Sequence, residues 1–201
     1  MISIVLIITA NVIGTIIGLR ALRSQAEAEK FLFIPHALAQ GRNIQGTVLS
    51  HVAHTGYGHL FFNMLSFFFF APTVAKMMGA IGLWTVYILS AVGADLLTFL
   101  LRRNDPGYAC LGASGSVTGV IFAAIVLNPY MNIFFFLIPI PIPGPIFALL
   151  YIALSLYFMK QEGAGISHES HIGGALAGFA IAALLSERGL GPLLERIREF
   201  L

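Results

Sequence analysis

The sequence predicts an all-α polytopic membrane protein, and its composition and the length of its apolar runs are the observations that predict this fold class. The 201 residues are 58% hydrophobic and only 10% charged, with a mean hydropathy of +0.88. A chain this apolar is neither a typical soluble globule nor a disordered protein. A membrane-spanning helix needs on the order of 20 apolar residues, and at least about 17, to cross roughly 30 Å of hydrocarbon. Six runs are candidates for such helices: residues 2–19, 59–75, 80–101, 113–127, 145–159 and 172–185.

Length divides these runs into two groups. The first three are long enough to cross a bilayer alone, whereas the last three hold roughly 13–15 residues, which is about 20–23 Å of helix. Residues 2–19 have no basic segment before them and no small-residue cleavage site after them, so they predict a retained first span and not a signal peptide. The short later helices must begin or end below the membrane surface, which leaves room for a cavity.

The segments outside the runs complete a single predicted domain over residues 1–201. Residues 20–58 form a long first loop with a charged, helix-prone part at 21–30 and an apolar patch that Pro35 ends, and we expect this loop to lie at the membrane interface. Asn128-Pro129 and the proline-rich run 138–145 cannot be regular helix, so they mark the turn between the fourth and fifth runs. Residues 187–201 place apolar side chains on one face and charges on the other, which predicts an amphipathic surface helix.

Charge and cysteine content exclude two kinds of site. The net charge of +2 is dispersed, without a basic run, which argues against binding to nucleic acid. Cys110 is the single cysteine, so the chain has neither an intrachain disulfide nor a CxxC site.

Three polar residues stand at corresponding ends of alternate runs. His59 opens the second run, Ser114 opens the fourth, and His171 immediately precedes the sixth. Six crossings put the starts of the second, fourth and sixth spans on the same side of the membrane. We therefore expect these three side chains at a similar depth on one face of the bundle.

Ser114 and His171 have the chemistry of a nucleophile and its base. A serine hydroxyl becomes a good nucleophile when a neighbouring base takes its proton, and a neutral imidazole is the usual base near pH 7. Small residues let two helix backbones come close, and they line one face of each helix: Gly115 and Gly119 on the fourth run, and Gly174 and Gly178 on the sixth. Such a stretch alone is typical of simple helix packing, but beside His171 it favours a serine hydrolase site.

Donors for a developing oxyanion stand nearby. His59 and Asn63 are four residues apart and so project from one helical face. Together with the Ser114 backbone N–H, which has no acceptor within its helix, they predict an oxyanion hole. Ser116 is a second candidate nucleophile, but it lies about 200° around the helix from Ser114.

Other polar residues predict structural roles. Asp95 is a carboxylate within the third run and so a functional candidate, but we expect it to be protonated or paired with Arg102 or Arg103 near the end of that run. We expect His54 to hydrogen-bond within the first loop. The segment His168-Glu169-Ser170-His171 lacks the HExxH spacing of zinc proteases, so we expect neither a metal nor another cofactor.

Three motifs carry a resemblance to a known family: residues 54–63 (His-Thr-Gly-Tyr-Gly-His-Leu-Phe-Phe-Asn), residues 112–115 (Gly-Ala-Ser-Gly), and residues 171–174 (His-Ile-Gly-Gly) with Gly178. They resemble the rhomboid intramembrane serine proteases, over roughly residues 40–185. The resemblance implies a six-helix core, Ser114 as nucleophile, His171 as base, and His59, Asn63 and the Ser114 amide as oxyanion hole. It also implies substrates in the lipid bilayer, namely membrane proteins whose transmembrane segments unwind easily and are cut near a small residue.

The chain departs from the family pattern at two places. Many members carry a Trp-Arg pair in the first loop, where this chain has Gln45-Gly46 after Arg42-Asn43. Some members place a tyrosine four residues after the nucleophile to stack on the base, and here that position is Thr118. We therefore expect packing or Thr118 itself to orient the base.

The family pattern implies a multi-pass protein of the plasma membrane with cytoplasmic termini. Under that orientation, four basic residues lie inside (Lys76, Arg188, Arg196, Arg198) and seven outside (Arg20, Arg23, Lys30, Arg42, Arg102, Arg103, Lys160). The positive-inside rule favours the opposite orientation. An interfacial first loop accounts for the difference, because basic residues at headgroups need not set the topology.

Two alternatives to a protease remain open. One is a catalytically silent rhomboid-like protein that binds membrane clients, although such relatives usually lack the nucleophile or the base. The other is a histidine-lined metal transporter, which the clustering of polar groups at one depth disfavours. The sequence implies no particular oligomeric state.

Overall fold

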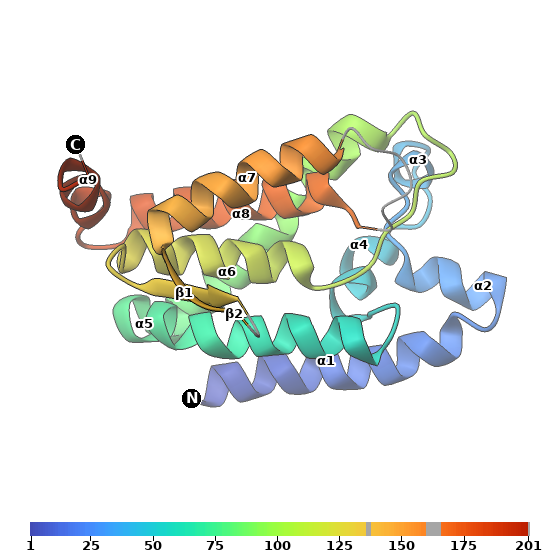
Figure 1. Ribbon diagram of the computed structural model, residues 1–201. Coiled ribbons are helices and arrows are strands. Elements are labelled where there is room, and N and C mark those ends of the chain that lie inside the picture. The colour runs from blue at the N-terminus through green and yellow to red at the C-terminus, as the bar shows by residue number, and fades with distance from the viewer. Residues whose placement is uncertain (136–137, 160–165, 201) are drawn as a thin grey trace.

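Figure 1 shows a computed structural model of the chain, which describes residues 1–135, 138–159 and 166–200. Lys160, from the count of basic residues, and Leu201, at the end of the amphipathic segment, lie outside the described residues. The long helices are α1 (Ile2–Ala21), α5 (Tyr57–Arg102), α6 (Ser114–Leu127), α7 (Gly144–Met159) and α8 (His168–Leu185). Short elements are α2 (Gln25–Ala28), η1 (Glu29–Phe31), α3 (Pro35–Ala39), α4 (Gly46–Leu49), η2 (Ser50–Val52), β1 (Asn132–Phe135), β2 (Ile138–Pro143) and α9 (Gly191–Arg198). The predicted helical fold class is confirmed.

The second and third predicted runs are two parts of one bent helix. α5 runs for 46 residues and is interrupted at Gly79, whose φ of 73° and ψ of −177° are not helical. Glycine adopts a positive φ at little cost because it has no Cβ, so the bend falls at this residue. By length and composition, α1 and α5 are the two helices of the described chain that could cross a membrane, and the predicted count of six crossings stays a prediction.

Helix α6 lies at the centre of the molecule, between α5 and α8 (Figure 1). Of its 14 residues, 12 are buried, which explains why this run is apolar on all sides. Its small residues let both neighbours approach. A Cβ added at Gly174 of α8 would lie 2.0 Å from the carbonyl oxygen of Gly115, and one added at Gly178 would lie 2.1 Å from that of Gly119. The two backbones are therefore in direct contact along the faces that the glycine spacing indicated.

The same kind of contact joins α8 to α5. A Cβ at Gly173 would lie 2.4 Å from the carbonyl oxygen of Gly93, and a Cβ at Gly93 would lie 2.5 Å from the Ala177 side chain. Helix α1 packs on the other side of α5, where the Asn11 side chain donates to the Tyr87 hydroxyl at 3.0 Å in a buried bond. Three helices, α5, α6 and α8, thus form the core, and α1 and α7 cover it.

Large apolar side chains project from the outer surface of these helices. Phe69 is 65% exposed, Ile81 84%, Leu149 74% and Leu184 80%. So many exposed apolar side chains indicate that this surface is covered by another apolar medium. For a chain of this composition, that medium is a lipid bilayer.

The connections differ from prediction in three details. The proline-rich run forms strand β2, which pairs antiparallel with β1 through Ile133 and Ile142; proline is tolerated because both strands of a two-stranded sheet are edges. Pro35 begins helix α3 instead of only ending the apolar patch, since the first helical position needs no N–H donor. Helix α9 spans Gly191–Arg198 and is shorter than the predicted 187–201, and its Leu193 packs into the core.

Candidate active site

One cavity of about 1130 Å³ is lined by all four residues of the predicted site, Ser114, His171, His59 and Asn63. Ser114 is the first residue of α6, His59 and Asn63 lie in the first turns of α5, and His171 lies in the first turn of α8. These three helices begin at the same end of the bundle (Figure 1). The structure thus brings together the side chains that alternate spans were expected to place at one depth.

The loop before Ser114 is tightly placed against His59. Gly112 has a φ of +136°, and a Cβ there would lie 2.7 Å from Cε1 of His59, so only glycine fits. The Gly112 N–H donates to the Ser50 carbonyl at 2.9 Å, which ties this loop to the first loop. The Ser114 N–H stands at the start of the helix, where no intrahelical acceptor exists, and it is free to bind an oxyanion.

His59 and Asn63 each hydrogen-bond to the residue four positions earlier in the chain. Nδ1 of His59 lies 3.2 Å from the Thr55 hydroxyl, which leaves Nε2 for the cavity. The Asn63 amide nitrogen donates to the His59 carbonyl at 3.0 Å and keeps a second hydrogen. Both side chains can therefore donate to an oxygen bound beside Ser114.

His171 is bound by a tyrosine that the sequence did not single out. Nδ1 of His171 lies 3.0 Å from the hydroxyl of Tyr151 on α7, and the two rings are within 29° of parallel. The Thr118 hydroxyl lies 3.2 Å from the same tyrosine hydroxyl and donates to the Ser114 carbonyl at 2.7 Å. Among the described residues no hydrogen bond joins Thr118 to His171, so Thr118 reaches the base through Tyr151, whose ring also packs on it. No hydrogen bond joins Ser114 Oγ to His171 within the described part of the chain, as is common in free enzymes whose catalytic bonds tighten with substrate.

A polar network holds the start of α8. Nε of Arg102 donates to Oε1 of Glu169 at 2.5 Å, and the Glu169 side chain is only 2% exposed. The Tyr108 hydroxyl donates to the Ser167 hydroxyl at 2.6 Å, and Arg102 lies over the Tyr108 ring. These contacts fix the helical turn that carries His171 against the end of α5.

The predicted partner of Asp95 is wrong. Arg102 pairs with Glu169, and Oδ2 of Asp95 lies 3.1 Å from Nε2 of His51, without the angles of a hydrogen bond. His51 comes from the first loop, which sequence separation gave no reason to place beside the third run.

His54 is buried and bonds outside its own loop, contrary to the prediction. Its Nδ1 lies 2.8 Å from the Thr15 hydroxyl on α1, and its Nε2 accepts from the Ala113 N–H at 3.4 Å. Burial and, to a smaller extent, the neighbouring His59 lower the pKa of His54 from 6.5 to about 3, so the ring is neutral near pH 7. His54 thereby joins α1 to the residue before Ser114.

The structure also bears on the second candidate nucleophile, Ser116, and on the metal-transporter alternative. The Ser116 side chain is fully buried and does not line the cavity, whereas Ser114 does. Among the described residues, no group of three or more His, Cys, Asp or Glu side chains is placed to hold a metal ion.

Sequence reasoning missed Tyr151 and the ion pair between Arg102 and Glu169, and it placed Gly112 in a motif without predicting its close approach to His59. Tyr151 had one usable signal, since it is one of three hydroxyl side chains in the apolar run 145–159, and such groups need partners. No signal in the sequence identified which helix would supply that partner.

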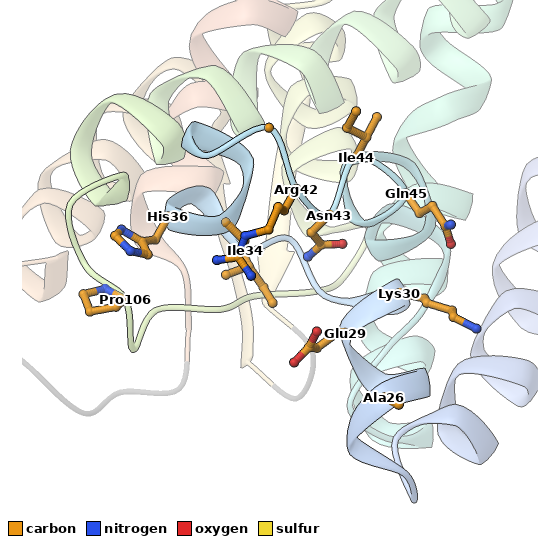
Figure 2. A pocket seen from close by; sticks show the side chains of 12 residues that line it. Ala26, Glu29, Lys30, Ile34, His36, Arg42, Asn43, Ile44, Gln45 and Pro106 are labelled. Carbon is orange, nitrogen blue, oxygen red and sulfur yellow. The ribbon is translucent and has the colours of Figure 1, made fainter.

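A second hollow of about 570 Å³ lies in the first loop and contains none of these residues. Figure 2 shows its side chains, among which Lys30 points away from Arg42. Lys30 is paired with Glu27, and Arg42 donates to Gln40. The two cationic side chains that line this hollow, Lys30 and Arg42, therefore already have partners within the loop.

Comparison with known protein families matches residues 42–188 to the rhomboid domain. The mitochondrial RHOMBOID-like protein 12 of Arabidopsis thaliana is 24% identical over 188 residues, which cover 85% of this chain and 54% of that protein. The mitochondrial rhomboid protein 1 of Saccharomyces cerevisiae is 29% identical, over 64% of this chain and 38% of that protein. The putative rhomboid protease YdcA of Bacillus subtilis is 28% identical, over 67% of this chain and 64% of that protein. The chain thus spans less than two thirds of the length of each of these relatives.

Proposed function

The chain belongs to the rhomboid family of membrane proteins, and on that premise we propose that it is an intramembrane serine endopeptidase with Ser114 as nucleophile and His171 as general base. The observation that carries the proposal is the single cavity lined by Ser114, His171, His59 and Asn63. Relatives named as proteases, including the putative rhomboid protease YdcA, support the same reaction class.

The proposed reaction uses the four residues in order. Oγ of Ser114 attacks the carbonyl carbon of the scissile peptide bond while Nε2 of His171 takes the hydroxyl proton. The Ser114 N–H, His59 and Asn63 donate to the oxyanion of the tetrahedral intermediate. The C–N bond then breaks, and His171 returns the proton to the leaving amine.

A second half-reaction regenerates the enzyme. Water attacks the ester carbon of the acylated Ser114 and loses its proton to His171. The ester C–O bond breaks, His171 returns that proton to Ser114 Oγ, and the new carboxylic acid leaves. No step requires a metal or another cofactor.

The proposed substrates are transmembrane segments of other membrane proteins. Residues of α5, α6, α7 and α8 line the cavity, and these helices carry exposed apolar side chains, which supports entry of an unwound segment from the bilayer. We also propose that the bend at Gly79 separates two crossings within α5, which gives six crossings in total and puts both termini on one side. The relatives include mitochondrial, chloroplastic and bacterial proteins, so the plasma membrane predicted from the sequence stays a prediction.

Covalent labelling tests the nucleophile. A fluorophosphonate should attach to Ser114 in detergent or liposomes, because a hydroxyl beside a general base attacks such electrophiles well. Labelling should vanish in Ser114→Ala, fall strongly in His171→Ala, and persist in Ser116→Ala, the matched control whose hydroxyl is buried outside the cavity. A chelator should not change it.

Two outcomes would replace the proposal. Folded protein that takes no label but still binds single-span membrane proteins would be a silent client-binding relative. Label on Ser116 would move the nucleophile to another face of α6 and contradict the assigned roles.

A further inference from the structure

The hydroxyl of Tyr151 lies beside Nδ1 of His171, where it can influence which ring nitrogen carries the proton. The tyrosine ring packs against Phe122 and Phe147, whose ring centroids each lie 5.8 Å from its own. This packing holds the Tyr151 hydroxyl 3.0 Å from Nδ1 of His171 and 3.2 Å from the Thr118 hydroxyl.

Counting protons along this path determines the direction of each hydrogen bond. Thr118 has one hydroxyl proton, which it donates to the Ser114 carbonyl at 2.7 Å, since a carbonyl can only accept. Oγ1 of Thr118 must then accept from Tyr151, so the single hydroxyl proton of Tyr151 is directed at Thr118. The Tyr151 oxygen is left as an acceptor toward His171, and Nδ1 of His171 must carry a proton.

The opposite direction leaves one bond unmade. If Nδ1 of His171 were the acceptor, Tyr151 would donate to it and Thr118 would donate to Tyr151. The Ser114 carbonyl would then lose its hydroxyl donor, and two of the three hydrogen bonds would remain. The arrangement with a proton on Nδ1 is therefore favoured by one hydrogen bond in a buried region, where an unmade bond is costly.

We propose that Tyr151 is a positioning residue that keeps the proton of neutral His171 on Nδ1, so that the lone pair on Nε2 is available to Ser114. This inference rests on the proposed function for its catalytic meaning. A base with the wrong tautomer presents an N–H to the serine and cannot take its proton. Tyr151 lies on α7, which contributes neither the nucleophile nor the base, yet its hydroxyl determines whether His171 can accept the proton of Ser114.

Nitrogen NMR of histidine-labelled protein tests the proposal directly, because the shifts of the two ring nitrogens report which one is protonated. The His171 signals are assigned by their loss in His171→Gln. In the wild type, Nδ1 should carry the proton. Tyr151→Phe keeps the ring packing but removes the acceptor, and the fraction with the proton on Nε2 should rise.

Kinetics give a second readout on the same variant. Turnover of a transmembrane reporter peptide should fall about tenfold, which converts to about 1.4 kcal/mol and is the size of one net hydrogen bond. KM should change little, because the hydroxyl contacts the base and not the substrate. Tyr157→Phe is the matched control, since Tyr157 lies on the same helix with its side chain 61% exposed, and it should behave as the wild type.

Thr118 provides variants that do not touch the tyrosine. Thr118→Val removes the acceptor for the Tyr151 hydroxyl and should shift the tautomer in the same direction, while Thr118→Ser keeps the hydroxyl and should restore the wild-type signals. Adding Thr118→Val to Tyr151→Phe should cause no further shift, because both act on one path.

The outcomes separate this inference from the proposed function. If Tyr151→Phe is folded and His171 keeps its proton on Nδ1, the inference is refuted, whether or not the protein cleaves peptides. If the tautomer shifts but wild-type Ser114 takes no fluorophosphonate, the positioning role stands and the protease proposal fails. If Tyr151→Phe does not fold, the comparison of the His171 tautomer in Thr118→Val with that in Thr118→Ser tests the inference instead.

Discussion

The direct backbone contact between α6 and α8 leads to a stability prediction whose size follows from the coordinates. In Gly174→Ala the new Cβ would lie 2.0 Å from the Gly115 carbonyl oxygen, whereas real Cβ contacts are essentially never shorter than 3.0 Å. The helices must therefore separate by about 1 Å, because the Gly115 oxygen belongs to the backbone and the position of an alanine Cβ is fixed by its own backbone. Overpacking costs up to about 3 kcal/mol, and alanine recovers about 1 kcal/mol of helix propensity, so we expect a net loss near 2 kcal/mol.

Thermal unfolding in detergent micelles, followed by circular dichroism, measures this loss. For a chain of this size, about 2 kcal/mol corresponds to a Tm lower by roughly 4–8 °C. The rate of fluorophosphonate labelling should fall as well, since the displaced helix carries His171. Gly58→Ala is the matched control, because a Cβ there meets nothing within 4 Å, and the same substitution should leave the Tm unchanged or raise it. A Gly174→Ala protein as stable as the wild type would refute the close-contact argument.

Three further predictions address other contacts. Asn63→Ala should lower turnover about 100-fold with an unchanged Tm, because it removes one of the proposed oxyanion donors. Burial lowers the pKa of His54, in the loop before α5, from 6.5 to about 3, so between pH 3 and pH 6.5 the unfolded state binds more protons than the folded state. The free energy of unfolding should therefore fall by about 2 kcal/mol from pH 7 to pH 5. This part of the pH dependence should disappear in His54→Gln. Arg102→Met should cost about 3 kcal/mol of stability by leaving Glu169 buried without its partner.

Each of these predictions has its own control. Asn104→Ala changes an exposed amide near the site and should keep full turnover, and full turnover in Asn63→Ala would mean that Asn63 does not face the oxyanion. Identical pH profiles for the wild type and His54→Gln would contradict the burial argument. Adding Glu169→Leu to Arg102→Met should restore most of the lost stability, and a double variant no better than the single one would show that the arginine acts through another contact.

Helix positions were largely predictable because they depend on local properties. The apolar run 113–127 became α6 (Ser114–Leu127), and the run 145–159 became α7 (Gly144–Met159). Both results follow from apolar length and from prolines that end a helix, which any segment carries by itself. The β-hairpin was not predictable in this way, since a strand at Ile138–Pro143 exists only through its partner at Asn132–Phe135.

From the sequence alone it was possible to identify the side chains that the proposed reaction would use. Ser114, His171, His59 and Asn63 stand in motifs at the starts of alternate spans, and topology alone brings such starts to one side of a bundle. The glycine faces of α6 and α8 were also readable, because a stripe of small residues follows from helical periodicity.

The identity of the side chains that surround the predicted residues became known from the three-dimensional arrangement of the helices. Arg102 bonds to Glu169 and not to Asp95, and His171 bonds to Tyr151 of α7 and not to Thr118 of α6. A hydrogen bond depends on ångström-scale distance and angle between groups on different helices. Spacing along one helix determines which face a residue occupies, but it does not determine how far or at what rotation the neighbouring helix stands.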